Sequence, residues 1–230
     1  MARLKRVVLD RLIRYYRYLV EFVVRQPVKT ITSAQIGRAL DVDPSQVRKD
    51  FAAVGLVGMS RIGYEVCEVC RAIRTVVGFD QPYTAVLVGA GQLGGAIMAS
   101  QEFERYGLRI IAAFDVDPFK IGRRIGGHTI EPIDDLPQFV AANQVRLAIL
   151  ATPVEVAQPL ADLLAACGVE AIWNFTPTRL AVPPGVLARN ERFSVGLGEI
   201  SYHLSHSQGR RPQVRRAFAE RHRPEGAALP

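Results

Sequence analysis

Apolar residues recur at three- and four-residue steps through the first 25 residues. This period predicts an amphipathic helix over residues 7–25 with one buried stripe, which Gln26-Pro27 ends. The stripe consists of Val8, Leu12, Tyr15, Leu19 and Phe22.

Two short helices are predicted next. The segment Thr32 to Gln35 forms a capping box for a second helix. Asp43 as N-cap and Pro44 at the first helical position then predict a third helix that starts near Pro44. Only residues 41–43 separate the two helices, which is typical of a helix-turn-helix.

The third helix carries side chains suited to DNA. Val47, Phe51 and Val54 repeat at four and three residues and are expected to face the core. Arg pairs with guanine edges, Gln with adenine, and Lys and Ser with phosphates, at the helix end that enters the major groove. A solvated amphipathic helix is the alternative. The candidate DNA contacts are Ser45, Gln46, Arg48 and Lys49, with Ser33 at the start of the second helix.

Residues 55–64 are too rich in glycine for a helix and predict a short hairpin, the wing of a winged helix. Arg61 near its tip is suited to a phosphate or to the minor groove, and Tyr64 joins the candidate contacts. Helical periodicity returns over residues 65–77 and ends at Gly78. Cys67 and Cys70 on this helix lack a second pair at zinc spacing, so we assign them to packing.

A glycine-rich turn follows the junction at residues 79–82. The run 85–88 predicts a buried parallel strand, and an apolar helix is expected through Ile97 and Phe103. The turn between them has the form G-x-G-x-x-G, which in this setting holds a dinucleotide pyrophosphate at the helix N-terminus. An α/β domain with an incidental glycine turn is the alternative. The candidate cofactor contacts here are Gly89, Ala90, Gly91, Gln92, Leu93 and Gly94.

A second strand over residues 109–114 ends at Asp115, 21 residues past Gly94. That spacing fits a carboxylate that binds the adenosine ribose and repels a 2′-phosphate, which favours NAD over NADP. Val116 and Lys120 join the candidate contacts. Arg123 and Arg124 nearby leave NADP open.

Further strands at residues 147–151 and 171–174, with helices at 134–142 and 155–166, predict a doubly wound parallel sheet. Loops after the strands line the ligand crevice of such sheets. The nicotinamide end is therefore expected at Thr152-Pro153 and at Asn174-Phe175-Thr176-Pro177.

The domain organisation follows from these elements. Residues 1–80 form a winged helix-turn-helix DNA-binding domain and residues 81–198 a Rossmann-like NAD(H)-binding domain. Residues 199–207 predict a short apolar helix that a partner subunit receives, and residues 208–230 a disordered basic tail. We predict no catalytic residue and no metal site.

The charge distribution supports this division. Residues 1–80 carry 14 Lys and Arg against 8 Asp and Glu, whereas residues 81–205 carry 9 against 12. A basic first third is typical of a polyanion-binding module. The chain has three cysteines, no apolar signal core and no run long enough to span a membrane, so we expect a cytoplasmic protein.

Residues 8–205 resemble the Rex family of bacterial redox-sensing transcriptional repressors. The resemblance implies a homodimer that exchanges C-terminal helices, binds a palindromic operator on double-stranded DNA when NADH is low, and releases it when NADH rises. It rests on Gln46-Val47-Arg48-Lys49-Asp50, Gly63-Tyr64, Val88-Gly89-Ala90-Gly91, Ala113-Phe114-Asp115-Val116-Asp117-Pro118, Lys120-Ile121-Gly122, Ala157-Gln158, Ala161-Asp162, Asn174-Phe175-Thr176-Pro177, Leu180 and Val182-Pro183.

Three positions depart from the family pattern. Ala52-Ala53-Val54 stands where the family has Ser-Tyr-Phe, so the DNA contacts there are expected to differ. Ser100 and Arg192 replace a tyrosine and an aspartate that link the nicotinamide site to the first helix. Arg11 matches the family arginine for that aspartate, so Arg192 opposite it would form a like-charge pair.

Other functions remain open. A small NAD-dependent oxidoreductase would leave the first 80 residues unexplained, and the chain has no Tyr-x-x-x-Lys pair. A coenzyme A or other nucleotide site could serve the same DNA-binding module. A Rex-like paralogue could bind DNA without a redox response, and the Ser100 and Arg192 departures motivate that reading.

Overall fold

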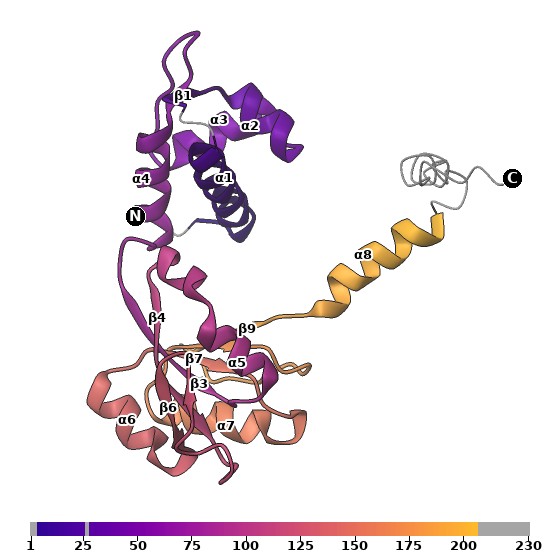
Figure 1. The fold of residues 1–230 in the computed structure, drawn as a ribbon. Coiled ribbons are helices and arrows are strands. Elements are labelled where there is room, and N and C mark those ends of the chain that lie inside the picture. The colour runs from indigo at the N-terminus through magenta and orange to yellow at the C-terminus, as the bar shows by residue number, and fades with distance from the viewer. Residues whose placement is uncertain (1–3, 26–27, 207–230) are drawn as a thin grey trace, which may run out of the picture.

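The computed structural model describes residues 4–25 and 28–206, and Figure 1 shows two folded units in that part of the chain. Gln26-Pro27 and the predicted tail at 208–230 lie outside the described residues. The N-terminal unit consists of α1 (Arg6–Arg25), β1 (Thr30–Ile31), α2 (Ser33–Leu40), α3 (Pro44–Ala53), β2 (Tyr64–Glu65) and α4 (Val66–Val77).

Local capping defines the helix ends of the N-terminal unit. The Thr32 side chain accepts from the Gln35 amide, and the capping box at the start of α2 is complete. The Asp43 carboxylate accepts from the Ser45 amide at 2.7 Å, with Pro44 at the first helical position of α3. Gly78 ends α4 in the left-handed conformation. The predicted helix-turn-helix is therefore present.

The core of this unit gathers the predicted stripe of α1 with apolar residues of α2, α3 and α4. The ring of Phe51 is fully buried and meets Tyr15 and Tyr64 edge to face, with ring centroids 5.6 and 4.8 Å apart. β1 and β2, which the sequence analysis did not predict, pair antiparallel beneath the wing.

The C-terminal unit is a seven-stranded, mostly parallel sheet in the order β5-β6-β4-β3-β7-β8-β9. Without β5, which pairs antiparallel with β6 at the edge, this is the 3-2-1-4-5-6 order of a Rossmann fold. The strands are β3 (Tyr83–Val88), β4 (Leu108–Asp115), β5 (Arg124–Ile125), β6 (His128–Pro132), β7 (Leu147–Leu150), β8 (Ala171–Asn174) and β9 (Leu187–Asn190).

Helices cover both faces of the sheet. One apolar cluster joins the strands to α6 and α7, and another joins the opposite face to α5 and to Phe103 of η1. The doubly wound prediction is confirmed. These helices are α5 (Gln92–Ala99), η1 (Gln101–Tyr106), η2 (Ile133–Asp135), α6 (Leu136–Asn143) and α7 (Val154–Ala166).

The helix predicted through Phe103 ends earlier. Ser100 has extended backbone dihedrals and ends α5 at Ala99. Its hydroxyl accepts from the Glu102 amide at 3.3 Å and starts the separate 3-10 helix η1. Local hydrogen bonding by serine therefore interrupts an apolar period that alone would favour one longer helix.

The two units meet at an aromatic contact. The ring of Phe79, just after α4, lies 5.6 Å from Tyr16 of α1 and 5.1 Å from Tyr106 of η1. A side chain on Gly107 would meet the Phe79 carbonyl oxygen at 3.0 Å. The end of η1 therefore packs against both the junction and the first helix.

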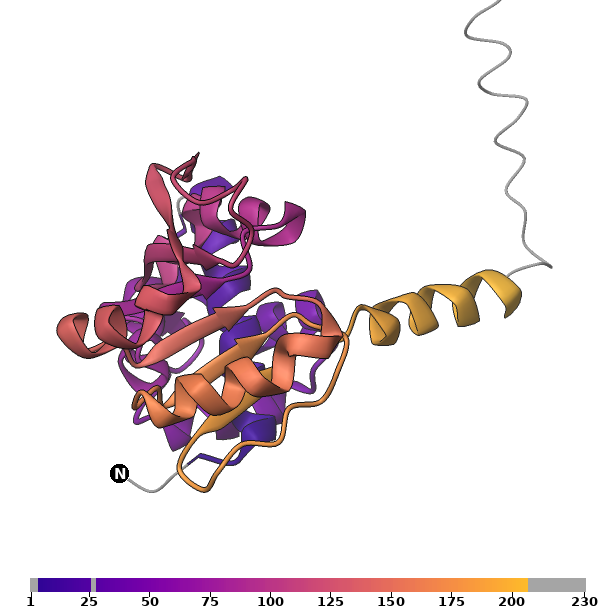
Figure 2. The same ribbon diagram turned by 90° about the horizontal axis from the view of Figure 1, so that it is seen from below.

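The last described helix, α8 (Phe193–His206), starts six residues before the predicted 199–207 helix. It projects away from the rest of the chain, and none of its residues is buried (Figures 1 and 2). The exposed apolar residues on it are Phe193, Val195, Leu197, Ile200, Tyr202 and Leu204. No helix within residues 4–25 and 28–206 is long and apolar enough to cross a membrane.

Candidate functional site

The exposed face of α3 is polar and basic at its N-terminal half. Ser45, Arg48 and Lys49 are exposed, while Val47 and Phe51 are fully buried as predicted. The Arg48 guanidinium donates to the Ser33 hydroxyl at 3.2 Å and so links α3 to the start of α2. Four of the predicted DNA contacts therefore lie on one side of the helix-turn-helix.

A buried carboxylate ties α3 to α1. Asp50 is 2% exposed and accepts both nitrogens of the Arg11 guanidinium at 2.6 and 2.7 Å. The Tyr15 hydroxyl and the Gln46 amide each donate to it at 2.9 Å. Burial alone would raise the pKa of Asp50, but the hydrogen bonds from Arg11, Tyr15 and Gln46 outweigh it and hold the pKa below its ordinary value.

Two of the predicted DNA contacts have a different environment from the one expected. Gln46 is half-buried and its amide nitrogen is held by Asp50, so it is not a freely rotating side chain on the groove face. Tyr64 is 8% exposed and packs against Phe51, so its ring belongs to the core and we remove it from the DNA contacts. Asp50 was not predicted as a site residue, although it lies between core positions of the third helix.

The wing is a tight turn closed by two backbone hydrogen bonds between Met59 and Gly63, at 2.7 and 2.9 Å. Arg61 sits in this turn with a positive φ of 64° and is exposed. Val57 and Ile62 beside it are 85% and 52% exposed. The turn therefore presents one cation flanked by apolar side chains.

The glycine-rich turn joins β3 to α5 at the point where the strand order reverses. A side chain on Gly89 would strike the Ala151 carbonyl oxygen of the neighbouring loop, and one on Gly94 would strike the Gly89 carbonyl oxygen. A side chain on Gly91 would meet nothing within 4 Å. Gly91 caps α5 without a side-chain hydrogen bond, and the first turn holds no acidic residue. Free N–H groups and the positive helix end therefore face open space, which fits a pyrophosphate.

The loop after β7 lies against this turn. Thr152 is half-buried, and its hydroxyl is a buried polar atom without a hydrogen-bond partner among the described residues. Its methyl group is the neighbour that a side chain on Gly89 would meet at 2.9 Å. Pro153 is exposed beside it. An unpaired buried hydroxyl costs stability unless a ligand or water completes it, so Thr152 also fits a polar group in this crevice.

Asp115 is held more tightly than the ribose-binding prediction assumed. Its carboxylate is 7% exposed and accepts from the Ala90 amide at 2.8 Å, from the Asp117 amide at 2.9 Å and from Lys120 at 3.0 Å. Burial raises its pKa, but these three donors outweigh it and lower the pKa overall. Asp115 therefore fixes the glycine-rich turn directly. Val116 beside it is 72% exposed.

The side chain of Asn174 does not face the ligand crevice, as the predicted cofactor contact would require. It is fully buried and its amide donates to the Thr178 carbonyl and to Asn190, each at 2.8 Å, while its oxygen accepts from the Thr176 amide. Its side chain therefore shapes the loop after β8. Thr176, another of the predicted nicotinamide-end residues, donates its hydroxyl to the Thr152 carbonyl at 2.9 Å and joins the two loops. Phe175 is half-buried.

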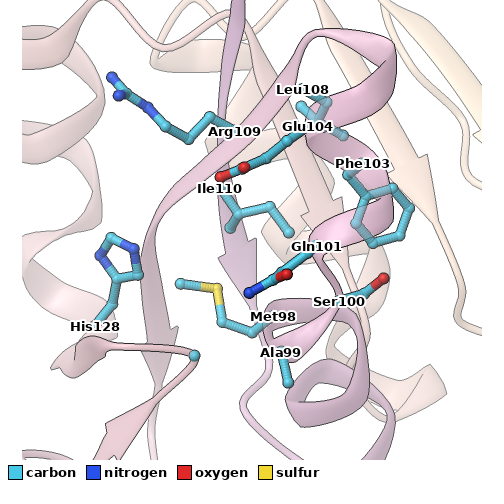
Figure 3. A pocket seen from close by; sticks show the side chains of 11 residues that line it. Met98, Ala99, Ser100, Gln101, Phe103, Glu104, Leu108, Arg109, Ile110 and His128 are labelled. Carbon is cyan, nitrogen blue, oxygen red and sulfur yellow. The ribbon is translucent and has the colours of Figure 1, made fainter.

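A hollow of about 330 Å³ lies away from the glycine-rich turn, between the end of α5, η1, β4 and the β5–β6 hairpin. Figure 3 shows Met98, Ile110 and Phe103 on its apolar side and Gln101, Glu104 and Arg109 around it. It does not include any predicted cofactor contact.

The cysteines have different surroundings from each other. Cys70 packs on the core of the N-terminal unit, and burial raises its pKa to about 11, which keeps it a thiol at neutral pH. Cys67 is exposed, so its assignment to packing was wrong. Among the residues that the structure describes, no group of three His, Cys, Asp or Glu side chains could hold a metal ion.

Comparisons with known proteins match both parts of the chain. Two family models match, "Putative DNA-binding protein N-terminus" over residues 6–52 and "CoA binding domain" over residues 80–178. A redox-sensing transcriptional repressor Rex of Rhodopirellula baltica is 36% identical over 203 residues, which is 88% of this chain and 85% of that protein. The chain belongs to the Rex family.

Other Rex proteins match over similar lengths. Rex of Syntrophobacter fumaroxidans is 35% identical over 205 residues, which is 89% of this chain and 97% of that protein. Two crystal structures of the Rex-family repressor RSP align over 90% of this chain. The complex with β-NADH has a TM-score of 0.82 and 33% identity, and the complex with β-NAD+ and operator DNA has 0.83 and 34%. The two alignments cover 97% and 95% of the respective RSP chains.

The departures from the Rex pattern lie at defined places in the structure. Ala52 and Ala53 are exposed on α3, Ser100 separates α5 from η1, and Arg192 is exposed just before α8. The sequence predicts a like-charge pair between Arg11 and Arg192. Within this chain, the Arg11 guanidinium instead forms an ion pair with Asp50.

Proposed function

We propose that this chain is a transcriptional repressor that binds a palindromic operator through α3 and the wing, and that leaves it when NADH occupies the glycine-rich turn. One observation carries the proposal: the same chain holds an exposed basic helix and a glycine-rich turn with room for a pyrophosphate. The turn lies where the strand order of the Rossmann sheet reverses. The Rex relatives are named as redox-sensing repressors, and RSP binds β-NADH and operator DNA. Such a protein works in the cytoplasm, on chromosomal DNA.

The proposed DNA contacts divide by chemistry. Arg48 and Lys49 enter the major groove, where Arg reads guanine acceptors, and Ser33 and Ser45 bind phosphates. Arg61 contacts the adjacent minor groove or its phosphates from the wing. Salt should therefore weaken binding steeply, since each neutralised phosphate releases counterions.

The proposed cofactor contacts follow the two ends of a dinucleotide. Gly91, Gln92 and Leu93 supply N–H groups at the pyrophosphate, while Gly89, Gly94 and Ala90, whose amide is bound to Asp115, shape the turn. On the adenosine side Lys120 lies 3.0 Å from Asp115 and 3.7 Å from Asp117, so two carboxylates surround one ammonium. The two carboxylates disfavour a 2′-phosphate beside them and support NAD over NADP, against the attraction of the exposed Arg123 and Arg124 that follow in the chain.

The nicotinamide end is proposed at Thr152, Pro153 and Phe175. Oxidised nicotinamide is positively charged and reduced nicotinamide is neutral, so burial penalises NAD+ through desolvation. A ligand shifts an equilibrium only when it prefers one state, so NADH must favour the arrangement that does not bind DNA.

Titration of an operator complex tests this function. NADH is expected to release the full-length protein from DNA at concentrations at least about tenfold below NAD+, a difference of about 1.4 kcal/mol. Fluorescence anisotropy of a labelled operator measures release, and coenzyme A serves as a third ligand. Equal potency of NADH and NAD+ would exclude redox sensing. Release by coenzyme A alone would favour a coenzyme A sensor, and no release by any ligand would favour a ligand-independent paralogue.

We also propose that α8 packs on a second copy of the chain. Phe193, Leu197, Ile200 and Leu204 form one apolar stripe, with Val195 and Tyr202 on the opposite side. An isolated helix of this length is marginal in water, and an apolar surface on both sides needs a partner. The exchanged helices that the family resemblance implies would cover it.

Substitution on this stripe tests the dimer. Ile200→Asp is expected to shift the protein from dimer to monomer at micromolar concentration, because a carboxylate would be buried without a partner. Sedimentation velocity measures the mass, and operator affinity should fall because one subunit reads only half a palindrome. Ser201→Asp places the same charge off the stripe and should leave the dimer intact. A dimeric Ile200→Asp protein would contradict the assignment.

A further inference from the structure

The groove-facing side of α3 ends in two alanines. Its exposed residues follow the steps i, i+3, i+4, i+7 and i+8, so they share one face of the helix. At a rise of 1.5 Å per residue this face is about 12 Å long, which corresponds to about three to four base-pair steps. The face consists of Ser45, Arg48, Lys49, Ala52 and Ala53.

The two halves of this face differ in chemistry. Ser45, Arg48 and Lys49 can donate hydrogen bonds to phosphates and base acceptors. Ala52 and Ala53 offer only methyl groups, which neither donate nor accept. Beyond Lys49, the helix therefore cannot read a base pair by hydrogen bonding from its side chains.

The backbone that carries the two alanines is firmly held. Phe51 beside them is fully buried between Tyr15 and Tyr64. The amides of Val54 and Leu56 both donate to the Phe51 carbonyl, at 3.1 and 3.0 Å, and close the end of the helix. Side chains on a rigid support meet a partner in a defined geometry, which readout by contact requires.

We propose that Ala52 and Ala53 read thymine, through contact of their methyl groups with thymine C5-methyl groups in the major groove. Thymine is the base whose major-groove edge carries a methyl group, and apolar side chains such as alanine recognise it. Arg48 and Lys49 on the same face hold the helix against the polyanion, and the short alanine side chains let it approach closely. The inference deepens the proposed function and rests on operator binding by α3.

The base-reading face does not include Gln46. With its amide nitrogen on Asp50 and its side chain half-buried, Gln46 lies beside the face and not on it. The first half of each operator half-site is then read by Arg48 and Lys49, and the second half by shape and methyl contact through Ala52 and Ala53.

Uracil substitution tests the inference, because it removes the thymine methyl group and nothing else. The full-length protein first selects its operator from randomised palindromes, without NADH. Each thymine of that operator is then replaced by deoxyuridine, one per half-site, and affinity is measured. The expected loss is about threefold to fivefold for each methyl group that Ala52 or Ala53 contacts, as burial of one methyl group predicts.

The protein side supplies the matched control. Ala52→Ser replaces the apolar contact with a hydroxyl. If Ala52 contacts a thymine methyl group directly, uridine substitution at that base pair should cause no further loss of operator affinity in this variant. This is the non-additivity that a double-mutant cycle detects. Ala141→Ser, on the exposed side of α6, should keep the full uridine effect. Circular dichroism confirms that each variant keeps its helices.

The possible outcomes distinguish failure of thymine recognition from failure of the proposed repressor function. Selection of a specific operator whose affinity is unchanged at every uridine substitution would overturn the thymine inference and leave the repressor proposal standing. Failure to select any sequence would overturn the proposed function and this inference with it. A uridine effect that persists in both Ala52→Ser and Ala53→Ser would assign the methyl contact to other residues and reject the inference.

Discussion

A Gly91→Val protein is expected to bind its operator and to ignore NADH. Gly91 has φ −78° and ψ −165°, which is extended backbone that valine adopts readily, and its side-chain position meets no atom within 4 Å. The valine would instead stand in the open space before α5. It would keep the pyrophosphate from the free N–H groups of the first turn.

The size of the effect follows from the contacts that would be lost. Hydrogen bonds to a charged group contribute about 1.5–3 kcal/mol each, so losing two of them weakens NADH binding by at least about 100-fold. Operator affinity without NADH should stay unchanged, because α3 and the wing belong to the other unit. In a cell, such a variant would repress permanently.

Trp173 makes the measurement direct. It is the single tryptophan of the chain, and it packs edge to face on Phe103 behind η1. Its emission overlaps the absorption of NADH, so energy transfer reports binding, and unchanged emission without ligand shows that the sheet is intact. Ala166→Val, at the far end of α7, adds comparable bulk on an exposed surface and should bind NADH normally. NADH binding of wild-type strength by Gly91→Val would remove the pyrophosphate site from the glycine-rich turn.

Elements with strong local signals were predictable from the sequence. The capping box at Thr32, the Asp43-Pro44 start and the glycine pattern at Gly89 to Gly94 each specify a backbone geometry within a few residues. Such signals depend on local hydrogen bonds and sterics, which a sequence states directly. The recognition helix and the Rossmann turn were therefore found in place.

Elements that depend on distant neighbours were missed. β9 is four residues long with a half-exposed pattern, and it is a strand because it continues the sheet beside β8. β1 is two residues long and pairs with β2, more than 30 positions away. Neither segment has a period that distinguishes it from a loop.

The site residues that the sequence analysis missed or misplaced also depend on distant neighbours. The roles of Asp50 and Asn174 come from partners on other elements, Arg11 for the first and Asn190 for the second. A polar residue at a core-facing position was the available signal for Asp50. Its partner could not be read from the pattern, because the pattern does not state which helices pack together.

An Arg11→Met protein is expected to lose about 3–5 kcal/mol of stability in its N-terminal unit. Methionine keeps much of the length and apolar volume of arginine, but Asp50, at 2% exposed, would lose both guanidinium hydrogen bonds. Removing one partner of a buried ion pair leaves an uncompensated charge, which costs about this amount. Operator affinity should fall with it, since Asp50 also anchors α3.

The chain supplies a matched control for burial. Arg146 and Glu170 form an ion pair with the same two-point geometry, at 2.7 Å for both hydrogen bonds, but both side chains are more than half exposed. Arg146→Met should therefore leave the unfolding midpoint unchanged within error. Urea unfolding followed by circular dichroism reports the helices of both units, while Trp173 fluorescence reports the sheet alone. A loss seen by circular dichroism but not by fluorescence therefore belongs to the N-terminal unit. Equal losses in the two variants would contradict a special role for the buried pair.

The dependence on pH distinguishes the lost ion pair from a simple packing defect. In the wild-type protein the folded pKa of Asp50 is lowered, so its contribution is present above the unfolded pKa of about 4 and is lost as the pH falls through the folded value. Without Arg11, burial dominates and the folded pKa of Asp50 should rise above the unfolded value. Acidification from pH 7 toward pH 5 then protonates the buried carboxylate and relieves its charge. The stability gap between wild type and Arg11→Met should therefore narrow over that range, whereas a packing defect would keep the gap constant.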